Sequence, residues 1–174
     1  MTYLLDLRLS DGGSASGYFK FDNDAAMAAS APGAGSYVSV GLVDFNILVA
    51  GGDTGKFPEM RYTRSNAKGT VIRRNDRPGF TVYAFDLTHA DGVVAGLVPA
   101  LRWTTPVDLP TKAGSSVELT TWGDVRFGLA NQQCYDCFPQ RQGVSGFITV
   151  VAAEPGFGPD GFPLKVPTPL PPAR

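Results

Sequence analysis

Histidine occurs once in the 174 residues and cysteine twice, so the side chains that most often carry catalysis or hold zinc are scarce. The single histidine, His89, falls in a predicted surface turn, and no Gly-x-Ser-x-Gly nucleophile elbow accompanies it. The carboxylates that a glycosidase would need in pairs are scattered along the chain: Asp44, Asp86, Glu118 and Asp124. We therefore expect no enzymatic activity.

Blocks of basic residues and long apolar runs are also missing. The net charge is −1, so nucleic-acid binding has no electrostatic support. No run approaches the roughly 18 consecutive apolar residues of a transmembrane helix, so we expect no membrane span. The first residues, MTYLLDLRLSDGG, have no basic start and their apolar part is interrupted by charges, so they are not expected to form a secretory signal.

The chain is instead rich in short segments whose apolar residues alternate with polar ones, the period of half-buried strands. The longest apolar stretch is Ser36–Gly52, SYVSVGLVDFNILVAGG. Its apolar set changes face after Leu42–Val43, which predicts one long strand with a bulge or twist near Gly41. We expect this strand to seed the sheet.

Further strands are predicted on both sides of this stretch, separated by turns that use many of the 21 glycines and 14 prolines. They cover Tyr3–Leu9, Ala15–Phe21, Glu59–Thr63, Thr70–Arg74, Phe80–Leu87, Val117–Trp122, Val125–Ala130 and Val144–Ala152, while Val93–Trp103 fits a strand or a short helix. The first two are expected to form a hairpin, and Val117–Trp122 and Val125–Ala130 another around Gly123–Asp124.

These segments predict an all-β protein, an antiparallel β-sandwich of jelly-roll-like or Ig-like type, over residues 1–152. Residues 153–174 are expected to form an extended tail, because seven of these 22 residues are proline.

Two clusters have the composition of small binding or cross-linking sites. Asp22, Asn23 and Asp24 are candidate calcium ligands, although they lack the later glycine and glutamate of an EF-hand loop and also fit a solvated turn. Cys134 and Cys137 form a C-x-x-C pair, for which a small disulfide in an oxidising compartment is favoured over zinc or thioredoxin-like chemistry. A reduced pair with no role is the next alternative. No cofactor is expected otherwise.

Surface recognition of sugars is a further candidate property. Trp103 and Trp122 are candidates for stacking on sugar rings, while aromatic residues at strand spacing also fit the core. The basic residues between positions 61 and 77 fit either an anion or polysaccharide patch or the solvated face of an edge hairpin.

Three segments carry a resemblance to a family. Ser16–Asp22 (SGYFKFD) and Val43–Gly52 (VDFNILVAGG) resemble two early strands of bacterial exosortase-sorted secreted proteins of the PEP-CTERM and VPLPA-CTERM type. Val144–Thr149, VSGFIT, resembles their closing strand, and Val166–Ala173, VPTPLPPA, looks like an expanded V-P-L-P-A sorting motif. The transmembrane helix and basic end of a full sorting signal do not follow in this sequence.

The resemblance implies export to the cell surface or extracellular matrix, and it implies no functional residue. We therefore expect a non-enzymatic extracellular structural protein, with a self-assembling matrix or filament subunit as a specific version. In that version the tail or the N-terminal strand docks on a neighbour's sheet edge. A carbohydrate-binding β-sandwich module is the alternative. The expected partner is a second copy of the chain or a polysaccharide.

Overall fold

The computed structural model describes residues 1–22, 37–77, 80–89, 98–105, 109–119, 126–130 and 140–151, and these contain strands and turns but no helix. The strands are β1 (Thr2–Leu9), β2 (Ser14–Lys20), β3 (Tyr37–Gly41), β4 (Asp44–Ala50), β5 (Met60–Thr63), β6 (Ala67–Arg77), β7 (Phe80–His89), β8 (Val98–Thr105), β9 (Ser116–Glu118), β10 (Arg126–Ala130) and β11 (Gln140–Val150). The predicted all-β antiparallel sandwich is confirmed. The predicted tail, residues 153–174, lies outside the described residues.

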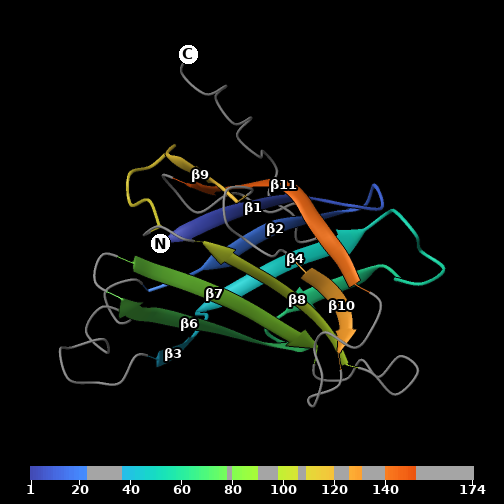
Figure 1. Ribbon diagram of the computed structural model, residues 1–174, viewed down its shortest axis with the longest axis horizontal. Coiled ribbons are helices and arrows are strands. Elements are labelled where there is room, and N and C mark those ends of the chain that lie inside the picture. Colours follow the sequence, from blue (N-terminus) through green and yellow to red (C-terminus); the bar gives the residue numbers. More distant parts are fainter. Residues whose placement is uncertain are drawn as a thin grey trace.

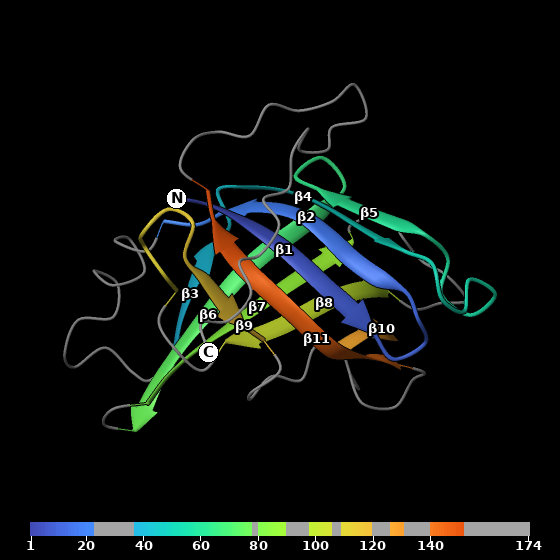
Figure 2. The ribbon, with the colours of Figure 1, turned by 90° about the horizontal axis from the view of Figure 1, so that it is seen from above.

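The strands form two layers that share one hydrogen-bonded path. Along the path the order is β3-β6-β7-β8-β10-β11-β1-β2-β4-β5, and β9 pairs with β11 beside it. We call β9, β11, β1, β2, β4 and β5 the first layer, and β3, β6, β7, β8 and β10 the second layer (Figure 1). Strands of the first layer run steeply across those of the second (Figure 2). In packing of this kind, strands that bend or bulge make the corners between the sheets.

One such corner lies in β11. Its first residues, Gln140–Gln142, pair with β10 of the second layer, and its later residues pair with β1 of the first layer. Between them the register shifts, since Arg8 faces Ser145 and Leu9 faces Gly143. Val144 is the extra residue of this bulge and is 56% exposed. A bulge bends its strand, which allows β11 to pass from one layer to the other.

A second corner lies inside the stretch that we predicted as one long strand, and that prediction is wrong. Tyr37–Gly41 pairs with β6 of the second layer, whereas Asp44–Ala50 pairs with β2 and β5 of the first. The Leu42 amide still donates to the Gly69 carbonyl at 3.0 Å, and the next amide, of Val43, donates to Lys20 of β2 at 3.0 Å. The change of apolar face in the sequence therefore coincides with a change of layer.

The second predicted hairpin is also wrong. Val117 pairs with Ile148 of β11 in the first layer, and Phe127 pairs with Leu101 of β8 and with Arg141. The first hairpin, β1–β2, is confirmed. Around the basic residues 61–77, β5 lies at the edge of the first layer, while β6 lies between β3 and β7 in the second.

The core lies between the two layers. The first layer contributes alternate residues of β1, β2 and β4, and the second contributes Val71, Leu101 and Trp103. The Phe19 and Trp103 rings meet with centroids 5.5 Å apart, and the Tyr3 ring stacks on Phe19 at 5.1 Å. This aromatic contact joins the two layers across the core.

Candidate functional site

The most elaborate polar arrangement among the described side chains lies where three distant segments meet. Asp11 comes from the β1–β2 turn, Gly51 and Asp53 come from the loop after β4, and Arg141 comes from the beginning of β11. The two turns connect the paired strands β1–β2 and β4–β5, and Arg141 lies in β11, where it pairs with Phe127 of β10. Their meeting depends on the pairing of β1 with both β2 and β11 and of β2 with β4. We call this cluster the Asp11–Arg141 clip.

Two parallel contacts join the carboxylate and the guanidinium. Arg141 Nη2 donates to Asp11 Oδ1 at 2.8 Å, and Arg141 Nε lies 2.8 Å from Asp11 Oδ2. The same Nη2 also donates to the Gly51 carbonyl at 2.6 Å. The hydrogen bond from Nη2 is charge-assisted and therefore stronger than one between neutral groups, and the close approach of Nε adds a second ionic contact.

Backbone amides complete the binding of the carboxylate. The Asp53 amide donates to Asp11 Oδ2 at 2.8 Å, and the Gly13 amide donates to Asp11 Oδ1 at 3.1 Å. One aspartate side chain therefore orders its own turn and also ties that turn to the β4–β5 loop. Such satisfaction by several donors is what a poorly solvated carboxylate requires.

The arginine is enclosed by small residues and one aromatic ring. Arg141 is 1% exposed, and its guanidinium carbon lies 5.4 Å from the centroid of the Phe57 ring. A side chain at Gly13 or Gly52 would collide with the guanidinium, and one at Gly52 also with the Asp11 carboxylate. Both positions therefore require glycine for close approach, and Gly52 also has a positive φ of 70°.

The pKa of Asp11 reflects this environment. Burial by itself would raise the pKa of the carboxyl, but the hydrogen bond from Arg141, those from the Asp53 and Gly13 amides and the charge of Arg141 outweigh it. The net result lowers the pKa of Asp11 from 3.8 to about 2. The carboxylate is therefore charged over the whole physiological pH range.

The chemistry of the clip is that of a structural fastener. The acid and the base are turned toward each other and toward backbone groups, so their charges hold three segments of the chain together. Within the described part of the chain, no group of three or more His, Cys, Asp or Glu side chains is close enough to hold a metal ion.

Most of the predicted site residues fall outside this cluster. Asp22 is exposed, while Asn23 and Asp24 of the candidate calcium cluster lie outside the described residues, as do Cys134, Cys137 and Trp122. His89, expected in a turn, is the last residue of β7 and pairs with Ala67.

Trp103 lies in the core and is 0% exposed, so its ring has no face available for stacking on a sugar. The suggestion of a glycan contact at Trp103 is therefore wrong for this structure. The physical reason is that Trp103 sits on the inward face of β8, opposite Phe19 of the first layer.

The clip itself was not predicted. Its only signal in the sequence is a pair of turns with related composition, Ser10–Gly13 (SDGG) and Ala50–Asp53 (AGGD). The first lies between two predicted strands, whereas most of the second was assigned to the end of the predicted strand Ser36–Gly52. Nothing local connects either of them to Arg141, which lies 130 positions from Asp11.

Comparisons with known proteins found no match for this chain among protein-family models, curated proteins or solved structures. A search of the described residues for a helix long and apolar enough to cross a membrane finds none.

Proposed function

We propose that this chain is a non-enzymatic structural β-sandwich that acts at the bacterial cell surface or in the extracellular matrix, with self-assembly into a matrix or filament as its specific version. The observation that carries the proposal is the use of the buried charge. Arg141 is the buried charged residue of the described part, and its contacts with Asp11 and Gly51 fasten turns to one another. A protein that serves as a rigid module needs stiff connections of this kind.

The sequence supports the location. The resemblance of Ser16–Asp22, Val43–Gly52 and Val144–Thr149 to strands of exosortase-sorted secreted proteins favours an exported protein, as does the V-P-L-P-A-like segment Val166–Ala173. The resembling strands form β2, β4 and β11, which belong to the same layer.

Assembly through the N-terminal strand does not fit the fold. β1 is hydrogen-bonded to β11 on one side and to β2 on the other, so it has no open edge to offer a neighbour. In the described part of the chain, β3 and β5 end the hydrogen-bonded path and β9 pairs with β11 alone. Strand addition at these three edges or contacts through residues 153–174 are the remaining routes.

No described residue favours the carbohydrate-binding alternative. Trp103 and Tyr62 are both 0% exposed, so neither ring can form a stacking platform. Sugar recognition would have to depend on residues such as Trp122, which the structure does not describe.

The test of the proposal is the mass of the protein in solution, measured by light scattering across a concentration series, with electron micrographs of the same samples. We expect defined oligomers or polymers. A parallel sample ending at Ala153 separates the routes, since loss of assembly would indicate residues 154–174 and its persistence would indicate the sheet edges. Monomers at every concentration would overturn the assembling version, and specific binding in a glycan panel would favour the alternative.

A further inference from the structure

The edge of the first layer at β5 is bonded by a side chain of the same molecule. Among the described strands β5 pairs with β4 alone, and it is the outermost strand of its layer (Figure 2). The backbone groups along such an edge are a template on which another molecule can add a strand. Asn66, in the turn that leads from β5 to β6, takes up several of these groups.

Asn66 binds the backbone of β5 through three polar groups. Its Oδ1 accepts from the Thr63 amide at 2.8 Å, and its Nδ2 donates to the Arg61 carbonyl at 2.9 Å. Its own amide donates to the Thr63 carbonyl at 3.1 Å. An asparagine side chain carries an acceptor and a donor side by side, so it bonds the edge of a strand as the backbone of a neighbouring strand would.

The backbone groups that Asn66 binds point away from β4. In an antiparallel pair, alternate residues turn their amide and carbonyl toward the partner strand, and the residues between them turn theirs to the other side. Arg61 and Thr63 are alternate residues of β5, and both are bonded by a residue outside β4. Their backbone groups therefore lie on the outer side of β5, while those of Tyr62 face β4, where Tyr62 pairs with Ile47.

We propose that Asn66 closes the β5 edge against strand addition by a second copy of this chain, so that this edge becomes a docking site only when the Asn66 side chain is removed or displaced. Both outward groups of Thr63 and the outward carbonyl of Arg61 are bonded by Asn66. An incoming strand would have to break these bonds before it could form its own.

The occupant that suits the uncovered edge is β5 of the second copy. A two-fold axis at Tyr62 would set Arg61 of one copy opposite Thr63 of the other, in an antiparallel register that uses the groups now bonded by Asn66. Like charges directly opposite each other destabilise a sheet, and this register does not place the two Arg61 side chains opposite each other. The same surface would serve on both copies, as in most two-fold dimers.

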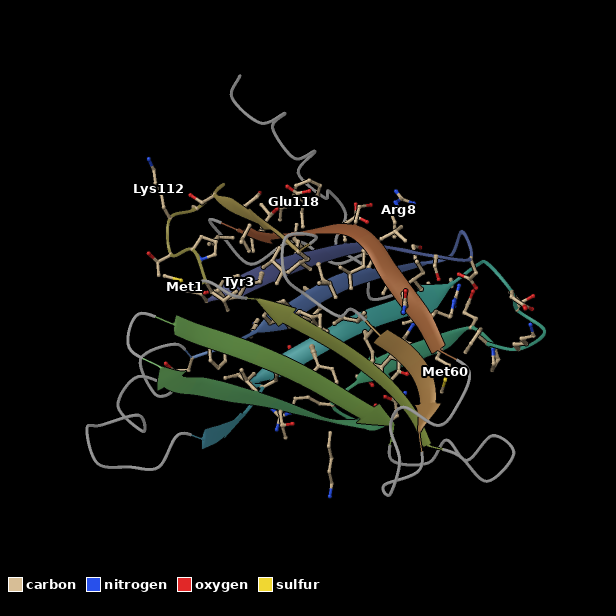
Figure 3. All side chains as sticks on the ribbon, viewed as in Figure 1. Met1, Tyr3, Arg8, Met60, Lys112 and Glu118 are labelled. Atoms are coloured by element: carbon tan, nitrogen blue, oxygen red, sulfur yellow. The ribbon has the colours of Figure 1, made fainter. Side chains whose placement is uncertain are left out.

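The position of β5 separates this edge from the edge at β9. β5 begins at Met60, which lies at the end of the molecule away from Lys112, in the loop before β9 (Figure 3). Closure of β5 narrows the proposed routes of assembly to the edges at β3 and β9 and to residues 153–174. The closure itself does not depend on whether the native chain assembles.

The test compares the mass of the native chain with that of Asn66→Ala, measured by light scattering at equal concentrations across one series. We expect a higher mass for the variant, as dimers if the native chain is monomeric and as larger assemblies if it already associates. Ser65→Ala is the matched control, because Ser65 is an exposed residue of the same turn whose hydroxyl contacts the Thr63 hydroxyl at 2.8 Å. This control should keep the mass of the native chain.

Amide hydrogen exchange, followed by nuclear magnetic resonance, shows where the variant associates. In dilute Asn66→Ala the Thr63 amide should exchange at least about fivefold faster than in the native chain, the factor expected for the loss of one hydrogen bond. The exchange should slow again as the concentration rises, because the second copy replaces Asn66. Adding Thr63→Pro to the variant removes this amide at an edge position that tolerates proline, and it should restore the mass of the native chain.

A folded Asn66→Ala variant with the mass of the native chain would overturn the proposal, as would association that leaves the Thr63 amide in fast exchange. If the variant does not fold, the native chain decides. Its Thr63 amide should exchange at a rate that does not depend on concentration, and a rate that falls with concentration would mean that the edge is already open. Because the comparison is between variant and native chain, a monomeric native chain would remove the assembling version of the proposed function and leave this inference in place.

Discussion

At the scale of single residues, Arg141 and Asp11 have the clearest energetic role. Arg141 is nearly inaccessible to water and makes polar contacts with the Asp11 carboxylate and the Gly51 carbonyl, while the Asp11 side chain keeps 21% of its surface exposed. Burying a charge is costly unless it is paired. The loss of either partner should therefore affect stability far more than the loss of an ordinary surface ion pair.

We expect Arg141→Met to lower the free energy of unfolding by about 3 kcal/mol, the lower end of the range for breaking a buried pair, because Asp11 regains some contact with water. Lys56→Met is the matched control, since Lys56 and Asp53 form a pair with 70% and 43% of their side chains exposed. The control should lose less than about 1 kcal/mol. Urea denaturation monitored by circular dichroism measures both, and equal losses would contradict a special role for the clip.

The pH dependence of stability should report the same pair. The pKa of Asp11 is lowered from 3.8 to about 2 in the folded protein, so its stabilising contribution is complete above the unfolded value and disappears as the pH falls through the folded value. Unfolding measurements on the native chain and on Asp11→Asn should show the largest difference above about pH 5. The difference should shrink between about pH 4 and pH 2, and a constant difference across this window would contradict the assignment.

At the scale of elements, the fold depends on strands that approach closely and on strands that change layer. β2 lies between β1 and β4, and its Gly17 pairs with Leu5 on one side and with Ile47 on the other. Gly17 has a φ of 152°, and a Cβ there would collide with the Asn46 carbonyl and lie 2.7 Å from Ile47 Cα. Since both obstacles are backbone of β4, neither can move as a flexible side chain could.

We expect Gly17→Ala to destabilise the protein by about 2–3 kcal/mol, because the β2–β4 pairing must open or the backbone must strain. Gly55→Ala is the control. Gly55 lies in an exposed loop, and its added Cβ would make only an ordinary 3.5 Å contact with Asp53. Thermal unfolding of the two variants should separate them clearly. A neutral Gly17→Ala would mean that β2 and β4 are not paired in this register.

At the scale of the whole molecule, the two layers are held together by side chains that meet across the core. Trp103 is the largest fully buried side chain described, and it reaches from β8 of the second layer to Phe19 of the first. Because interiors are close-packed, removing such a side chain leaves a cavity that the layers can only partly close.

We expect Trp103→Ala to cost about 3–5 kcal/mol in the free energy of unfolding. Val144→Ala is the control, because Val144 is 56% exposed at the bulge of β11 and should change stability by less than about 0.5 kcal/mol. Chemical denaturation followed by circular dichroism gives both values. A small effect at Trp103 would show that the layers do not pack around this ring.

The sequence by itself determined the class of the fold and many of its strands. The alternation in Tyr3–Leu9, Ala15–Phe21 and Val144–Ala152 is a local property with a period of two, and it depends only on which face meets the core. The β1–β2 hairpin was also predictable, since the Ser10–Gly13 turn joins its strands directly.

Only the tertiary structure decided which strands pair and which polar groups meet. The same alternation in Ser36–Gly52 fits one bulged strand or two strands in different layers, and the choice depends on β6 and β2, which lie elsewhere in the chain. Val117 likewise pairs with β11 rather than with its neighbour in sequence. The Asp11–Arg141 clip is the extreme case, because it unites residues that no local pattern connects and exists only after β1 has paired on both sides.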